Sequence, residues 1–250
     1  MTDWQALDGR LREALGLSVP PIAITFRAPG DAPVAPAFGA PMPDVAPAFG
    51  APMPDATPDG RTGSVAAGCV FWMEGADATF TTVAADHGNC SVGSVTHGFK
   101  TLQEVAGNAD VAALLESNWV TMEVVPQIPV VKQQPAAVVY GPLLETPVDP
   151  DVVLLRVTGR QLMVLHDAIP ELRIEGKPQC HIVAIAKEQG QVAASVGCQL
   201  SRVRTAMPNA EMTCAIPSGR LENVIERVEA AATADRAVAA YAADDMVRFS

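Results

Sequence analysis

Apolar positions recur along the chain with two different periods. From Trp4 to Leu15 they return every three or four residues, which predicts an amphipathic helix over residues 3–16. The same spacing predicts helices over residues 64–74, 110–119, 159–168 and 181–190, and a last helix after Ser218. Alternating or continuous apolar runs, typical of strands, cover residues 22–26, 78–83, 136–144, 152–157, 191–200 and 211–217. Because these strands and helices are interleaved, we expect an α/β or α+β fold with a single mixed β-sheet flanked by helices.

One segment departs from both periods. Residues 28–62 are rich in Pro, Gly and Ala, and the sequence VAPAFGAPMPD stands at 34–44 and again at 45–55. Such a composition favours extended, solvated backbone, and an insertion costs little free energy when the ends of the loop are already fixed. We therefore expect a Pro/Ala-rich surface insertion that arose by tandem duplication, within a single globular domain over residues 1–250.

Charge and hydropathy narrow the classes of partner. The formal net charge is −11, whereas nucleic acid or an anionic membrane surface calls for a basic face. The first residues include acids and no apolar run, so we expect neither a secretory signal nor a membrane span, and place the protein in the cytoplasm. The expected partners are a small-molecule substrate or a redox partner protein, with no nucleic acid and no membrane. Whether identical chains form a homo-oligomer stays open.

The five cysteines divide into two groups by their neighbours. An odd number in a cytoplasmic chain argues against a full set of disulfides, and no C-x-x-C pair is present. Gly68 directly precedes Cys69 and Gly197 directly precedes Cys198, while Gly93 follows Cys90 by three residues and Pro178 precedes Cys180 by two. Such neighbours suit a backbone that wraps around an inorganic cluster, which groups Cys69, Cys90, Cys180 and Cys198. Cys214 lies in a strand-like run, where a cysteine packs as a small apolar residue.

Residues 86–99, DHGNCSVGSVTHGF, concentrate chemically active side chains. His87 and His97 flank Cys90 in a polar, Gly-rich loop, where ligands and proton-transfer groups often lie. His166, on an apolar helix, is expected to pack. If residues 198–204 run extended, Arg202 and Arg204 lie on the same face as Cys198. The two guanidinium groups would then form an anion pocket or activate the thiol. The simpler alternative is that both arginines are exposed at the end of a strand and have no chemical role.

Several of these segments resemble one family. Its signatures are similar to residues 86–99, 176–186 and 195–205, with further agreement at 69–74, 140–155 and 215–224. The chain is thereby identified as a member of the DUF169 proteins, a prokaryotic family of poorly defined function, over residues 64–230. The resemblance implies family cysteines at 69, 90, 180 and 198 and none at 214. Leu200, Ser201 and Arg204 depart from the family pattern, so no substrate pocket is carried over.

Four functions follow from these residues. The first is an iron–sulfur protein, with a [4Fe–4S] cluster held by Cys69, Cys90, Cys180 and Cys198, in redox or cluster-assisted small-molecule chemistry. It would act as an oxidoreductase or a lyase, with His87, His97 and Arg202 as catalytic residues. The second is a structural zinc site with the same ligands. The third is a metal-free enzyme with Cys180 or Cys198 as nucleophile, and the fourth a binding module in which the thiols only pack.

Overall fold

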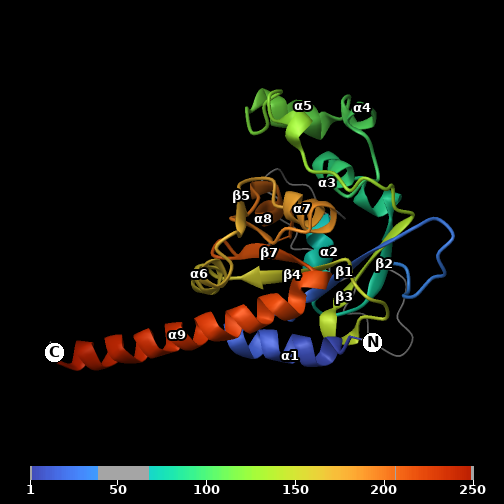
Figure 1. Cartoon of the computed structure of the whole chain (residues 1–250). Helices are drawn as coiled ribbons and strands as arrows, with labels where there is room; N and C mark the ends of the chain where they lie inside the picture. Colours follow the sequence, from blue (N-terminus) through green and yellow to red (C-terminus); the bar gives the residue numbers. More distant parts are fainter. Residues whose placement is uncertain (1, 39–67, 206, 249–250) are drawn as a thin grey trace.

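The computed structural model describes residues 2–38, 68–205 and 207–248, and it shows a mixed sheet flanked by helices (Figure 1). The seven strands are β1 (Ile22–Arg27), β2 (Phe80–Val83), β3 (Ala137–Pro142), β4 (Val152–Val157), β5 (Arg173–Glu175), β6 (Ala193–Ser195) and β7 (Met212–Pro217). Their order in the sheet is β2-β3-β1-β4-β7-β6-β5. Only β5 and β6 pair in parallel, and every other pair of neighbours is antiparallel. The fold is therefore α+β, and the predicted single mixed sheet is confirmed.

Helices cover both faces of this sheet. One face packs on α1 (Trp4–Leu15), α6 (Gly159–Ala168) and α9 (Leu221–Arg248). The opposite face carries α2 (Gly68–Glu74), α7 (His181–Gln189) and α8 (Gln199–Thr205). Three short helices form a lobe beyond that second layer, and they are α3 (Ser91–Thr96), α4 (Leu102–Val105) and α5 (Ala109–Glu116) (Figure 1). Four 3₁₀ turns complete the elements: η1 (Ala84–His87), η2 (Val125–Gln127), η3 (Leu143–Glu145) and η4 (Ser218–Arg220).

The strands explain why their apolar runs are continuous rather than alternating. Val153 and Leu155 of β4 point into the core beneath α1, α6 and α9, whereas Val152 and Leu154 point into the core beneath α2 and α7. All four side chains are fully buried. A strand covered on both faces buries successive residues on opposite sides, so each position is apolar. The sheet thus separates two hydrophobic cores.

The ends of several helices follow from local sequence. Asp3 caps α1, because its side chain accepts a hydrogen bond of 2.9 Å from the Ala6 amide. Gly16 and Gly190 end α1 and α7 in the left-handed conformation, with φ of 63° and 62°. These signals are why the predicted bounds of both helices are confirmed to within a residue.

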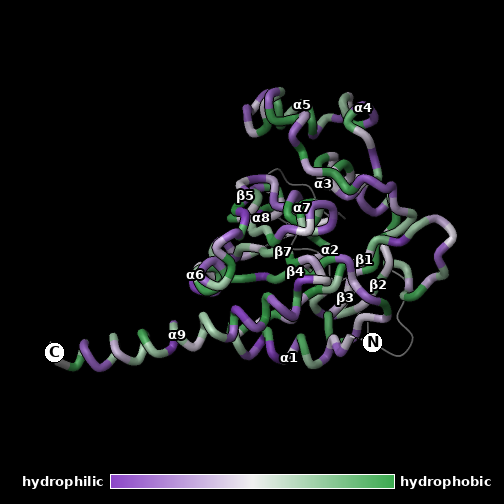
Figure 2. The backbone as a smooth tube through the Cα atoms, viewed as in Figure 1, coloured by the Kyte–Doolittle hydropathy of each residue, from purple (hydrophilic) through white to green (hydrophobic). Residues whose placement is uncertain are grey.

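The last helix extends beyond the body of the protein. Its first three turns pack against α1 and α6, but the turns that follow project away from the body, with hydrophobic residues among them (Figures 1 and 2). Val238, Tyr241 and Met246 are 66%, 63% and 75% exposed. Within the residues described, no helix combines the length and the apolar character that crossing a bilayer requires.

Two sequence predictions need comment, the Pro/Ala-rich insertion and the strand over residues 191–200. Residues 39–62 of the insertion lie outside the described residues. The start of the first repeat joins the sheet instead of standing free, since the Phe38 amide donates to the Thr81 carbonyl at 2.8 Å. The strand predicted over residues 191–200 is wrong beyond Ser195, because Gly197 adopts φ 118° and the chain then turns into α8.

Candidate functional site

Four of the five cysteines meet in one cleft. They come from α2, from the residues that precede α3 and α7, and from the residue before α8, and they are Cys69, Cys90, Cys180 and Cys198. We refer to these four as the cleft cysteines. Cys214 lies apart from them, fully buried in the core on the other face of the sheet. The tertiary structure thus makes the same division among the cysteines that their sequence neighbours indicate.

Cys90 is fixed by the lobe. The residue after it, Ser91, begins α3, and Asp110 of α5 binds both its amide, at 2.9 Å, and its hydroxyl, at 2.7 Å. Asn108 donates to the same hydroxyl at 2.8 Å. A carboxylate at the first turn of a helix satisfies amide groups that have no partner within the helix. The position of the Cys90 thiol therefore depends on contacts between α3 and α5.

Cys180 is buried, as Cys198 is, whereas Cys69 and Cys90 are partly exposed. Its sulfur lies 3.4 Å from the Thr96 hydroxyl, which itself donates to the Val92 carbonyl. Burial, and then the nearby thiol of Cys90, raises the pKa of Cys180 well above its usual value. Without a compensating cation this sulfur stays a neutral thiol, which is a poor nucleophile.

The space among the cleft cysteines is narrow. It encloses about 20 Å³, the room of one water molecule. In the part of the chain that the structure describes, no group of three or more His, Cys, Asp or Glu side chains is arranged so that it could hold a metal ion. A zinc ion would need its sulfurs within ~4 Å of one another, because a Zn–S bond is about 2.3 Å long. A larger group would require the segments that carry the thiols to move apart.

His87 and His97 lie behind the cleft, not in an exposed loop. Residues 84–97 form η1 and α3, and both histidines are 1% exposed, because Val92, Val95 and Phe99 draw this segment into the core. The two imidazole rings are 5.3 Å apart, and the ring of His97 lies against Gly68, next to Cys69. The predicted polar, Gly-rich loop is therefore largely helical and its histidines are buried, although they do lie beside the cysteines.

The hydrogen bonds of these rings define their tautomers. His97 donates from Nδ1 to the Gly93 carbonyl at 2.8 Å, which leaves a lone pair on Nε2. The Thr82 hydroxyl donates to the Val138 carbonyl, so it accepts from Nε2 of His87 at 3.0 Å, and the lone pair of His87 is on Nδ1. Burial lowers the pKa of His97 to about 4. The pKa of His87 is lowered well below 6.5, mainly by burial and secondly by the nearby His97. Both rings are neutral at pH 7.

Two further polar groups share this buried region. Tyr140 and His87 stack with their centroids 6.4 Å apart. Burial, and then the nearby thiols of Cys69 and Cys180, raises the pKa of Tyr140 well above 10. Within the described residues, the Tyr140 hydroxyl, the Trp72 indole nitrogen, His87 Nδ1 and His97 Nε2 have no hydrogen-bond partner. Buried polar groups are normally paired, so four unpaired ones beside four thiols mark a functional region.

Comparison with known proteins agrees with the resemblance seen in the sequence. The sequence model of the DUF169 family, described as uncharacterised ArCR, matches residues 10–227. The chain belongs to the DUF169 family. The match extends further towards the N-terminus than the signature segments indicate. Neither a curated protein nor a solved structure matches the chain.

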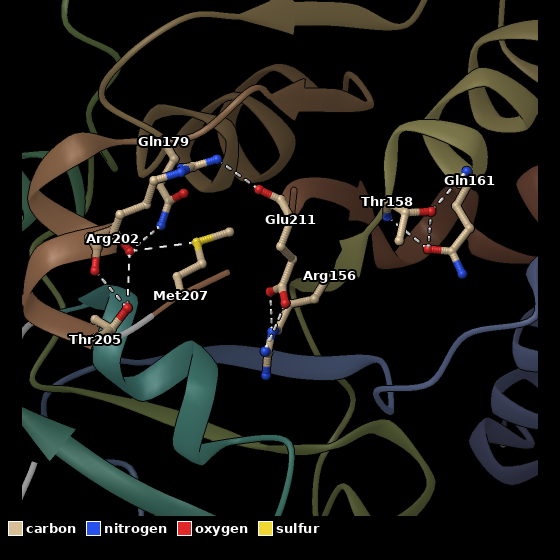
Figure 3. A network of polar contacts seen from close by, with 9 residues as sticks. Arg156, Thr158, Gln161, Gln179, Arg202, Thr205, Met207 and Glu211 are labelled. Atoms are coloured by element: carbon tan, nitrogen blue, oxygen red, sulfur yellow. Dashed lines mark hydrogen bonds and ion pairs between the residues drawn. The ribbon is translucent and has the colours of Figure 1, made fainter. Parts of the chain in front are cut away.

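In this DUF169 protein Arg202 ties backbone segments together. It lies on α8, so the extended conformation considered for residues 198–204 is wrong. Its Nη2 donates to the carbonyls of Val196, Asn209 and Glu211 at 3.2, 3.1 and 3.0 Å, and Figure 3 shows the contact with Glu211. The arginine thereby holds the turn that carries Cys198 against the segment after α8. This is a positioning contact at the edge of the cleft.

His166 lies outside the cleft, whereas Gln179 lines it without having been predicted. His166 is exposed on α6, so the expectation that it packs is wrong: the apolar stripe of that helix is formed by Val164, Leu165 and Ala168. Gln179, which the sequence did not indicate, lines the cleft and donates to Ser201 at 2.8 Å, within the network of Figure 3. Its only sequence signal is its place next to Cys180.

Proposed function

We propose that this DUF169 protein binds an iron–sulfur cluster, of the [4Fe–4S] type, through its cleft cysteines. The observation that carries the proposal is the convergence of four thiols from four separate segments in one cleft, with the fifth cysteine excluded. Cysteine thiolates are the ligands of such clusters, and ligands scattered in sequence are acceptable when their segments meet. Thiols packed this closely oppose one another's ionisation, and a bound cationic centre reverses that penalty.

A cluster and a single zinc ion place different demands on the cleft. Four cysteines that each bind a different iron need a wider spacing than four that bind one ion, so a cluster requires the segments around the space of about 20 Å³ to move apart. Cys69 lies on α2, and Cys198 directly precedes α8. These two short helices pack on each other, and we propose that a shift between them makes room for the cluster.

The buried groups behind the cleft are suited to hold and move protons. An iron–sulfur cluster supplies electron transfer when four cysteines bind it, or a Lewis-acidic iron for a small substrate when three do. His87 and His97 are neutral and each keeps a free lone pair, so each accepts a proton when negative charge develops nearby. The Tyr140 hydroxyl is protonated and available as a donor. Arg202 keeps the Cys198 turn in place.

The same reasoning covers partners and reaction class. We propose an oxidoreductase or a lyase that meets a small-molecule substrate or a redox partner protein in the cytoplasm, where thiols stay reduced. A metal-free thiol enzyme is less well supported, since Cys180 is a neutral, buried thiol. Cys198, the other proposed nucleophile, is also buried.

The test is the composition of protein purified without oxygen from iron-replete cells. We expect about four irons and four acid-labile sulfides per chain, with broad visible absorption that a reductant bleaches. Zinc is measured on the same sample. Stoichiometric zinc without sulfide would replace the cluster by a structural metal site. Metal-free protein with one rapidly alkylated cysteine would instead identify a thiol enzyme.

A further inference from the structure

A second, apolar pocket lies within the lobe, beside the cysteine cleft. It encloses about 260 Å³ between α3, α4, α5 and the segment that follows α5. Its walls are mainly aliphatic side chains such as Val105, Leu114 and Ile128, and the described residues that line it include no charged group. Val92 lines both this pocket and the cysteine cleft. Preformed pockets lined mainly by apolar side chains are typical of small-molecule sites.

A positively charged cleft adjoins the apolar pocket. Val95 and Leu102 line both spaces, and the second encloses about 580 Å³. Lys100 and Lys132 line it, and neither takes part in the ion pairs found among the described residues. The one acid in its lining, Glu104, already accepts hydrogen bonds of 2.7 and 2.8 Å from the backbone and hydroxyl of Thr101. Two lysines thus line one cleft on a chain with a net charge of −11.

We propose that the pocket and the adjoining cleft together bind a small amphipathic anion. Its hydrocarbon body occupies the apolar pocket, and its carboxylate or other acid group lies between Lys100 and Lys132. The volume of the pocket exceeds the ~150 Å³ in which benzene binds, so it accepts a short aliphatic chain or a single ring. The site goes beyond the proposed cluster and does not depend on it. Through Val92, its ligand lies next to the cleft cysteines.

The probe for this site is octanoate, with octan-1-ol as its uncharged counterpart, each titrated calorimetrically into the whole chain. Ala106 is exposed and lines the apolar pocket, so Ala106→Trp fills the pocket from its rim without disturbing a buried residue. Ala112 is equally exposed on α5 but does not line the pocket, and Ala112→Trp is the matched control. The double variant Lys100→Gln/Lys132→Gln removes the charges that face the acid group.

We expect one octanoate per chain, with binding at least tenfold weaker in Ala106→Trp and unchanged in Ala112→Trp. The double lysine variant should weaken octanoate about tenfold and leave octan-1-ol unaffected. Absence of octanoate binding, equal binding by both tryptophan variants, or equal loss of octanoate and octan-1-ol in the lysine variant would overturn the proposal. So would a dimer that Ala106→Trp dissociates while octanoate fails to bind, since the occupant would then be a second copy. Repeating the titration with Cys90→Ser separates this site from the cluster: binding should persist.

Discussion

Replacing His97 tests whether the buried imidazoles make the protein sensitive to acid. His97 is fully enclosed, and its pKa falls from 6.5 to about 4 on folding. Between these two values the unfolded chain binds a proton that the folded chain does not, so acid favours unfolding. Stability is therefore complete above pH 6.5 and decreases as the pH falls towards 4. His87 acts in the same direction, because burial also lowers its pKa.

The size of the effect follows from the pKa of His97. One pKa unit corresponds to ~1.4 kcal/mol, so the full difference for this histidine is about 3 kcal/mol, of which about 2 kcal/mol is lost by pH 5. The variant His97→Asn keeps a donor for the Gly93 carbonyl but does not titrate. It also leaves a small cavity, which lowers stability by a similar amount at every pH. The informative quantity is therefore the change with pH.

Urea unfolding of both proteins, in chelator and reductant near pH 7.5 and again near pH 5, measures that change. The wild-type free energy of unfolding should fall between these two conditions by about 2 kcal/mol more than that of His97→Asn. If the two proteins lose the same amount, His97 is not the buried neutral imidazole described above, and its assignment as a proton acceptor beside the cleft is refuted.

Three further predictions concern the cleft. Gly197→Ala places a Cβ 2.0 Å from the Arg202 guanidinium, at a residue with φ 118°. It should lower the free energy of unfolding, measured in urea, by about 2 kcal/mol. An unchanged urea midpoint would show that this turn is not strained. Asp110→Ala removes two hydrogen bonds to Ser91 and should lower the free energy of unfolding by about 2 kcal/mol. It should also reduce the iron that the protein retains after gel filtration. Full retention of iron would mean that the lobe does not hold the Cys90 loop. In metal-free protein Cys180 should be alkylated more slowly than Cys90, as read by peptide mass spectrometry, and the reverse order would contradict its raised pKa.

Much of the fold could be predicted because the hydrophobic period is local. The helix over Gly159–Ala168 and the strand over Val152–Val157 coincide with the residues that the sequence indicates. Residues 191–200 could not be interpreted in this way. Their apolar residues suit a strand, but the left-handed conformation of Gly197 and its contact with Arg202 depend on the folded chain.

The sequence indicated which cysteines lie together, but not how deeply the neighbouring histidines are buried. Glycines near Cys69, Cys90 and Cys198 and Pro178 before Cys180, against the strand-like run around Cys214, separate the cleft cysteines from the fifth, because a backbone that bends near a thiol leaves a local signal. Burial of His87 and His97 leaves no such signal: it results from packing against Phe71, Phe99 and each other. The apolar pocket of the lobe also escaped sequence analysis, since its lining residues come from four separate segments.

The most direct test of the account compares five single Cys→Ser variants of the whole chain, purified without oxygen, for iron and sulfide content. The account predicts that each change at a cleft cysteine, at 69, 90, 180 or 198, lowers iron and sulfide together, whereas Cys214→Ser keeps the wild-type content with at most reduced stability. Equal metal content in all five variants, or loss only in Cys214→Ser, would contradict a centre built by these four thiols.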